Sequence, residues 1–368
     1  MQDYKHITII GLGLIGGSIC RAVRRKCPST TLVGVDRPQV LQLAHRERVI
    51  DRGYQPEELA QACAGADLIV IATPITAAMT LLEILPPMLS HPTLVTDVCS
   101  LKSDIMALAQ RTFTQTPAVF IGGHPMAGSE KPGLQHADPF LFENAMYVLT
   151  TLPNTPERAV HNLGNFLHTL GAHVVLMDAE THDRIAAAVS HLPQILAVTL
   201  MNYVADKNEK NPMVLKMAAG GFRDMTRIAS SPYEIWKDII RGNRRRILDE
   251  IDGLLSALHQ MRDKIATQDL ADEFQRAARH RLSIPKDTRG FLHAHYDISV
   301  EVEDRPGIIA TIATALAEAD INIKDIEVLK VRENEGGTLR LAFESHEVRR
   351  RAIERLQQRG FTCHEREH

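Results

Sequence analysis

The chain has 368 residues, which is enough for two or three domains, and its 44% hydrophobic and 24% charged residues are ordinary for a globular protein. Its formal net charge of −3 gives no indication of nucleic acid or an anionic membrane surface as a partner. No apolar run approaches the roughly 20 residues that cross a bilayer, so we expect no membrane partner.

The chain enters a strand almost at once, and we therefore expect no signal peptide. The five cysteines are odd in number and lack CxxC spacing: Cys20, Cys27, Cys63, Cys99 and Cys363. Such scattered cysteines indicate reduced, mostly buried thiols and a cytoplasmic location. The histidines do not fall at ligand spacing with cysteines or carboxylates, so we expect no metal site.

The first strand, over residues 6–10, ends in the glycine pattern Gly11-x-Gly13-x-x-Gly16, and a helical pattern follows from Leu14. A strand, three glycines and a helix are the context that the dinucleotide fingerprint requires. Gly11 permits a tight turn, Gly13 admits a pyrophosphate, and Gly16 lets the helix pack on the strand. The amides from Gly13 through Leu14 and Ile15 then face the pyrophosphate at the helix N-terminus.

The next strand, over residues 31–35, ends at Asp36. A carboxylate there accepts hydrogen bonds from a ribose 2′-hydroxyl and repels a 2′-phosphate, so the sequence favours NAD over NADP. Arg37 weighs against strict selection, since an arginine nearby can hold that phosphate. The alternative is a strand, turn and helix without a ligand.

Further strands are predicted at residues 66–72, 93–97, 119–123, 144–150 and 173–177, with helices at 38–49, 77–89 and 156–170. The consecutive apolar residues of 68–71 are typical of a parallel strand covered on both faces. We therefore expect a doubly wound α/β domain of the Rossmann type over residues 1–177. Thr73 and Pro74 follow the third strand, at the edge where the cofactor should pass.

Two loops at strand ends present polar groups to the same crevice, residues 99–102 and 124–130. His124, between Gly123 and Pro125, is the natural general base near neutral pH. Ser100 can hydrogen-bond either a substrate hydroxyl or this imidazole. A structural role for His124 is about equally probable on sequence alone.

From residue 178 to about 284 the pattern is helical, with candidate helices at 181–190, 194–205, 211–218, 232–242 and 243–265. A helical domain that dimerises and borders the active site is the economical interpretation, and an ordinary helical core is the alternative. Pro193 predicts a helix start beside His191 and Gln194. Arg227 lies amid apolar residues and is a candidate clamp for a carboxylate. From the residues alone, an ion pair with Asp224 or Glu234 is the favoured explanation of Arg227, and a buried structural histidine is the favoured explanation of His191.

Residues 285–293 are predicted to form a linker, and residues 294–368 a small α+β domain of order βαββαβ. No charged pair or nucleophile stands out in this last domain, so we interpret it as a binding or regulatory unit.

Five motifs in order resemble the prephenate dehydrogenase family over about residues 5–285: GLGLIGGS, DVCSLK, GGHPMAGSE, SHLPQ and GFRDMTRIASSPYEIWKDI. The last domain, with DRPGIIA and Asn322-Ile323, is similar to an ACT domain, a module that binds amino acids and small effectors. On this resemblance its candidate regulatory residues are Asp304, Pro306, Gly307 and Asn322.

The resemblance implies oxidative decarboxylation of prephenate to 4-hydroxyphenylpyruvate with NAD⁺, and feedback inhibition by tyrosine through the ACT domain. His124 matches the family's catalytic histidine and Ser100 its supporting serine. Arg227 matches the arginine that grips a substrate carboxylate. Ser129 and Glu130 match residues at the mouth of the site, and His191 lies in the SHLPH-like motif.

This chain departs from the motif at Gln194, where the family has a second histidine. If this position contacts the substrate side chain, a neutral amide changes the discrimination between prephenate and arogenate. An arogenate dehydrogenase is therefore the alternative function. A different β-hydroxyacid dehydrogenase and a non-catalytic sensor of nucleotides and amino acids are the remaining hypotheses.

Overall fold

The structure is a computed structural model that describes residues 4–128, 131–267, 270–283, 296–303, 305–332 and 336–365. The chain divides into two compact units, Met1–Asp269 and Leu270–His368. The predicted linker at 285–293 lies outside the described residues, as do Ser129, Glu130 and Asp304.

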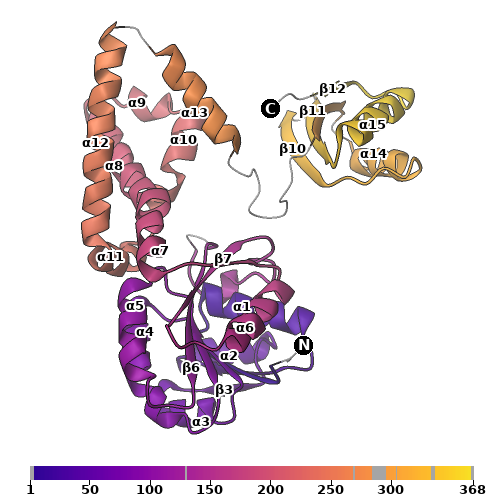
Figure 1. Cartoon of the computed structure of the whole chain (residues 1–368). Coiled ribbons are helices and arrows are strands. Elements are labelled where there is room, and N and C mark those ends of the chain that lie inside the picture. Colours follow the sequence, from indigo (N-terminus) through magenta and orange to yellow (C-terminus); the bar gives the residue numbers. More distant parts are fainter. Residues whose placement is uncertain are drawn as a thin grey trace. The chain divides into compact units, whose positions relative to one another are not determined.

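The first unit contains an eight-stranded sheet in the order β3-β2-β1-β4-β5-β6-β7-β8 (Figure 1). Neighbouring strands from β3 to β6 are parallel, β7 is antiparallel to β6, and β8 is parallel to β7. The strands are β1 (His6–Ile10), β2 (Thr31–Val35), β3 (Arg52–Tyr54), β4 (Leu68–Ile71), β5 (Leu94–Asp97), β6 (Val119–Pro125), β7 (Met146–Thr151) and β8 (His173–Leu176). The predicted doubly wound sheet is confirmed; β3 is too short to show a periodic pattern in the sequence.

Helices cover both faces of this sheet, which is why β4 is apolar at every position. Val70 belongs to the core beneath α1, α2 and α6, whereas Ile71 belongs to the core beneath α3, α4 and α5. The helices are α1 (Leu14–Lys26), α2 (Pro38–Arg46), α3 (Leu59–Cys63), α4 (Ile75–Ile84), α5 (Ser103–Thr112) and α6 (Glu157–Thr169). The predicted helix over 77–89 ends earlier, because Pro86 and Pro87 start a separate 3₁₀ turn, Pro86–Met88.

The strand β6 is longer than predicted, and this changes the setting of His124. His124 pairs with Val148 and Pro125 with Tyr147 across the antiparallel ladder to β7. The prediction that His124 lies in a loop was therefore wrong. It was based on the glycines and Pro125, but Pro125 is the last residue of β6, and strand ends accommodate proline.

The helical part begins with α7 (Ala179–Ala186), the π-helical turn η4 (Ala187–His191) and α8 (Leu192–Lys210). These follow one another in one continuous run, and α8 begins at Leu192 with Pro193 in its first turn, which confirms the helix start predicted there. Proline has no N–H to donate back to the preceding turn, and the wider π-helical turn just before it accommodates that loss.

The remaining elements of this part are α9 (Met213–Lys216), α10 (Gly220–Thr226), the 3₁₀ turn η5 (Arg227–Ser230), α11 (Tyr233–Gly242) and α12 (Arg244–Thr267). By length and composition alone, the run Ala179–Lys210 is long and apolar enough to cross a membrane, with 28% of its apolar window buried. The apolar pattern predicts two separate helices, 181–190 and 194–205, in place of this continuous run. Core helices of soluble proteins meet the same criterion, and His182, Asp183 and His191 within it are buried and hydrogen-bonded.

The second unit contains α13 (Ala271–Ser283) and a four-stranded antiparallel sheet of order β10-β11-β9-β12. Its elements are β9 (Tyr296–Val302), α14 (Ile308–Ala317), β10 (Asp325–Arg332), β11 (Gly336–Phe343), α15 (His346–Gln358) and β12 (Cys363–Glu365). This order confirms the predicted βαββαβ arrangement.

A charge cluster lies on this small sheet, contrary to the prediction that no charged pair stands out. Arg340 on β11 donates to Asp297 on β9 and to Asp325 and Glu327 on β10. Asp297 is distant in sequence from Asp325 and Glu327, which share β10, and the strand register brings all three carboxylates to one guanidinium.

Candidate active site

Strands β1, β4, β5 and β6 all end at one edge of the large sheet, and the predicted cofactor residues lie there. Gly11 has φ +97°, and a Cβ at this position would lie 2.6 Å from the Ala72 carbonyl oxygen. A Cβ on Gly16 would lie 1.9 Å from the Gly11 oxygen, whereas one on Gly13 would meet nothing within 4 Å. Gly11 and Gly16 are therefore required by the fold, and Gly13 leaves space beside the N-terminus of α1.

The polar groups beside this space fit a dinucleotide. The Asp36 carboxylate lies at the end of β2 and accepts a hydrogen bond from the Leu12 N–H at 2.7 Å. The Thr73 hydroxyl, directly after β4, is buried without a hydrogen-bond partner among the described residues. A buried hydroxyl without a partner is costly, so it points to a group that completes the site. Thr73 also borders Gly11, since its Cγ2 lies 3.1 Å from the position of a Gly11 Cβ.

A buried ion pair supports the loop after β5. Asp97 accepts hydrogen bonds from the Cys99 N–H at 2.9 Å and the Gly123 N–H at 3.0 Å, and it pairs with the Lys102 ammonium. The Asp97 and Lys102 side chains are both 0% exposed. The pair thus fixes the end of β5 against β6 and joins the two ends of the loop that carries Ser100, which is half-buried.

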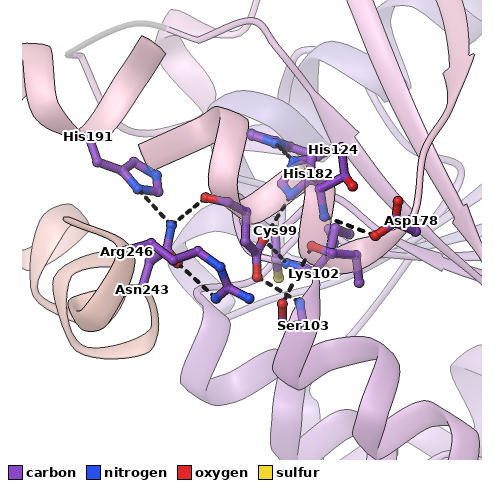
Figure 2. A network of polar contacts seen from close by, with 12 residues as sticks. Cys99, Lys102, Ser103, His124, Asp178, His182, His191, Asn243 and Arg246 are labelled. Carbon is purple, nitrogen blue, oxygen red and sulfur yellow. Dashed lines mark hydrogen bonds and ion pairs between the residues drawn. The ribbon is translucent and has the colours of Figure 1, made fainter. Parts of the chain in front are cut away.

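The ring of His124 contacts a second histidine, His182 on α7 (Figure 2). His124 Nδ1 lies 2.8 Å from His182 Nε2, and His182 Nδ1 lies 2.8 Å from Asp183 Oδ1. Asp183 also accepts hydrogen bonds from the Lys102 N–H at 2.8 Å and the Ser103 N–H at 2.9 Å. The carboxylate therefore lies at the N-terminus of α5, where the helix dipole favours a negative charge.

These contacts set the charges of the site. Burial lowers the pKa of His124 well below its usual range, and the neighbouring His182 lowers it further. Burial by itself raises the pKa of Asp183, but hydrogen bonds from His182, Ser103 and Lys102 outweigh it and bring the pKa to about 2. His124 is therefore neutral and Asp183 ionised near neutral pH.

His191, predicted as a substrate contact, is 1% exposed. Its Nδ1 accepts a hydrogen bond from the Asn243 amide at 3.2 Å, and its ring lies edge-on to Trp236. Asn243 also donates to the Asp183 carbonyl oxygen at 2.7 Å, and Arg246 donates to Asn243 Oδ1 at 3.2 Å (Figure 2). The ring of His191 thus belongs to a buried network that joins η4 to α12.

Gln194 is also buried, and its amide N–H donates to the Ile228 carbonyl oxygen at 3.0 Å. This bond ties α8 to η5, the turn that begins at Arg227. Arg227 itself is exposed. The structure therefore gives Gln194 an intramolecular contact next to the arginine.

Sequence reasoning missed His182, Asp183, Asp97 and Lys102. The available signal for the first two was an adjacent His-Asp pair on a helix that otherwise carries apolar positions; for the other two it was a carboxylate and a lysine flanking one strand-end loop. Neither signal shows which partner each side chain meets.

The predicted regulatory residues lie at different ends of the small sheet. Gly307, with φ +87°, precedes α14 and follows the end of β9, whereas Asn322 precedes the start of β10. The strand pairing places the end of β9 opposite Gly337 and the start of β10 opposite Ala342, at the two ends of β11. Pro306 and Asn322 are both exposed.

Three family models match the chain. The prephenate dehydrogenase nucleotide-binding domain matches residues 19–176, the prephenate dehydrogenase dimerization domain matches residues 178–279, and the ACT domain matches residues 296–361.

Individual relatives agree with these matches. The prephenate dehydrogenase of Bacillus subtilis is 37% identical over 359 residues, which cover 96% of each chain. The structure of prephenate dehydrogenase from A. aeolicus with hydroxyphenyl propionate and NAD⁺ is 26% identical, with a TM-score of 0.70, over 77% of this chain and 99% of that one. The structure of Synechocystis arogenate dehydrogenase is 31% identical, with a TM-score of 0.63, over 75% of this chain and 97% of that one.

The nucleotide-binding and dimerization models together cover more than two thirds of the chain, and the Bacillus relative covers nearly all of it. The fingerprint glycines, the histidine at the end of β6 and the helical run that contacts it agree with that assignment. The chain belongs to the prephenate dehydrogenase family.

Proposed function

We propose that this chain catalyses the NAD⁺-dependent oxidative decarboxylation of prephenate to 4-hydroxyphenylpyruvate, a step of tyrosine biosynthesis. The observation that carries the proposal is His124, which lies at the same sheet edge as the glycine fingerprint and is held by a second histidine. A base at that edge faces the place where ligands bind in doubly wound sheets. The family supports the substrate.

The dinucleotide would lie across the ends of β1, β2 and β4. Gly11, Gly13 and Gly16 shape the turn, the amides of Leu14 and Ile15 face the pyrophosphate, and Asp36 accepts from the ribose. Thr73 and Pro74 line the path beyond β4. NAD⁺ bound here would supply the hydride acceptor. The Asp36 carboxylate supports NAD over NADP, although Arg37 lies beside it.

His124 would accept the proton of the ring hydroxyl of prephenate while the hydride leaves the ring carbon that carries this hydroxyl. Ser100 would hydrogen-bond that hydroxyl from the end of β5. Arg227 would bind a substrate carboxylate, since a guanidinium matches a carboxylate in a bidentate manner. Ser129 and Glu130, which follow β6 in sequence, would line the mouth of the site. His191 and Gln194 would support the substrate site indirectly. His191 contacts Asn243, and Gln194 contacts Ile228, which follows Arg227.

The alternative function is that of an arogenate dehydrogenase, which makes tyrosine directly. The 31% identity to the Synechocystis enzyme and the presence of Gln194 favour keeping this alternative. Reduced nicotinamide formation should be followed with prephenate and arogenate, each with NAD⁺ and NADP⁺. Faster turnover with prephenate and NAD⁺ is expected; faster turnover with arogenate would establish the alternative, and no turnover with either would refute both.

The role of His124 has a direct test. We expect His124→Asn to retain NAD⁺ binding and to lose at least about 10²-fold in kcat, the usual contribution of general base catalysis. Wild-type turnover in this variant would refute the assignment. A His161→Phe variant is a matched control, because His161 lies on α6 and bonds to Asn165.

We propose that tyrosine is the effector of the ACT domain and inhibits the reaction. Pro306 and Gly307 belong to one end of the small sheet and Asn322 to the other, about 20 Å apart at ~3.3 Å per strand residue. A single site that uses both groups would therefore take them from two copies of the domain. Inhibition by tyrosine that persists after Gly307→Val and Asn322→Ala would exclude this site.

We further propose a homodimer formed through the helical domain, in the cytoplasm. The matched dimerization model supports it, as do the exposed apolar side chains of the run 179–210, among them Val189 at 61% and Tyr203 at 59%. The five cysteines are all free, which suits a reducing compartment. Sedimentation equilibrium tests the dimer.

A further inference from the structure

The hydrogen bonds around His182 determine which nitrogen of each histidine carries a proton. The Asp183 carboxylate can only accept, so His182 Nδ1, 2.8 Å from Asp183 Oδ1, is the donor. In a neutral ring the other nitrogen then has a lone pair. His182 Nε2 is therefore an acceptor.

The same reasoning determines which nitrogen of the His124 ring carries a proton. His124 Nδ1 lies 2.8 Å from the accepting His182 Nε2, so His124 donates through Nδ1. In the neutral His124 ring, Nε2 then has the lone pair. The catalytic candidate is thus presented with its base on the nitrogen away from His182.

We propose that His182 is a positioning residue that holds His124 in the Nδ1-protonated tautomer, with Asp183 fixing His182 in turn. The proposal rests on the proposed function, because it assigns the base atom of that reaction. Two features of the structure support it: His182 is 2% exposed, and its ring meets His124 edge-on with ring centroids 5.0 Å apart. Its partner Asp183 is held independently by the amides at the start of α5.

The hydrogen bonds from His182 to Asp183 and from His124 to His182 form a relay. This relay also stabilises the positive charge that forms on His124 during the reaction. The ring hydroxyl proton moves to His124 Nε2, the hydride moves with its electron pair to NAD⁺, and carbon dioxide leaves with rearomatisation. The proton then returns to the phenolic oxygen, so His124 ends unchanged. While His124 is cationic, its Nδ1–H still donates to His182, and the negative charge of Asp183 lies one ring away. The Asp183 charge raises the pKa of His124 and so favours its cation. Burial and the charge of Lys102 act in the opposite direction.

Two substitutions at His182 separate hydrogen bonding from shape. His182→Phe keeps a flat ring but accepts no hydrogen bond. His182→Gln places an amide oxygen near the position of Nε2, where it can accept from His124 Nδ1. We expect kcat with the preferred substrate to fall by about 10²-fold in His182→Phe and to recover at least about tenfold in His182→Gln. The NAD⁺ dissociation constant and the KM should change less than about threefold in both.

The acidic limb of the pH profile of kcat/KM gives a second readout. It reports protonation of His124, with His182, Lys102, His191 and Asp183 as the titratable groups around it. A charge on His182 lowers the pKa of His124, whereas a neutral His182 that accepts from Nδ1 stabilises the His124 cation. If His182 acts as the neutral acceptor, the limb should move to lower pH in His182→Phe, and a move to higher pH would contradict the proposal. The His161→Phe variant should match the wild type.

The tautomer itself can be measured without substrate. In ¹⁵N-histidine-labelled protein, the His124 signals, assigned with His124→Asn, should show a protonated Nδ1 and an unprotonated Nε2. A His124 ring protonated on Nε2 would overturn the proposal, and so would equal losses of kcat in His182→Phe and His182→Gln. Because this measurement needs no turnover, a protein that shows the Nδ1–H tautomer but converts neither substrate would refute the proposed function and not the relay.

Discussion

The substitution Gly13→Ala should weaken NAD⁺ binding without lowering the stability of the fold. Gly13 has φ −74° and ψ −156°, an extended conformation with negative φ that does not require glycine, and its Cβ would meet nothing within 4 Å. The free energy of unfolding should therefore stay within about 0.5 kcal/mol of the wild type. The methyl group would, however, lie where a pyrophosphate approaches the N-terminus of α1. Losing one charge-assisted hydrogen bond costs about 1.5–3 kcal/mol, so the NAD⁺ dissociation constant should rise roughly 10- to 100-fold.

Two further glycines calibrate this experiment. Gly16→Ala would place its Cβ 1.9 Å from the Gly11 oxygen, so it should lower both stability and binding. Gly253→Ala, on α12 with open space around it, should change neither adversely. Binding is measured by calorimetry and stability by denaturant titration. Wild-type NAD⁺ affinity in a folded Gly13→Ala protein would refute the argument that the pyrophosphate passes this residue.

Arg227→Ala should raise the KM for prephenate far more than the KM for NAD⁺, and steady-state kinetics that find equal effects would exclude a carboxylate clamp. Lys102→Met should destabilise the first unit by about 3–5 kcal/mol, because it leaves the buried Asp97 charge unpaired, and adding Asp97→Asn should restore part of this in denaturant titrations. Burial lowers the pKa of His191 to about 4, so this neutral ring contributes stability above pH ~6.5 that is lost as the pH falls towards 4. The contribution is about 3 kcal/mol, and His191→Gln should flatten the dependence of unfolding free energy on pH between 7 and 4.5; an unchanged slope would contradict it.

The sequence was informative wherever a pattern is local. A buried strand followed by Gly11, Gly13 and Gly16 predicts its own turn, because each glycine is required by its immediate neighbours. Apolar periodicity likewise predicts most strands and helices to within a few residues. It fails at His124, where the distant strand β7 extends β6, and it does not indicate the π-helical turn that joins α7 to α8.

Such local patterns do not predict which side chains contact one another in the candidate site. His182 and His124 are 58 residues apart, and Asp183 and the α5 amides are about 80 apart. Nothing in the spacing of these residues indicates that they meet. The Arg340 cluster was missed for the same reason, since only strand register brings Arg340 and Asp297 to the carboxylates of β10.

Asp183 makes the chemistry of the site depend on the fold around it. Its carboxylate accepts hydrogen bonds from the amides at the start of α5 and from the His182 ring. Its backbone carbonyl accepts a hydrogen bond from Asn243, next to α12. His182 therefore cannot turn away from His124 without releasing its bond to a carboxylate that also holds α5. The sheet and the helical part of the first unit are tied at the residue that orients the base, so we expect motions that admit substrate to occur around this point and to leave the relay intact. Substitutions that loosen α5 should accordingly alter kcat before they alter the affinity for NAD⁺, whose predicted contacts lie on β1, β2 and β4.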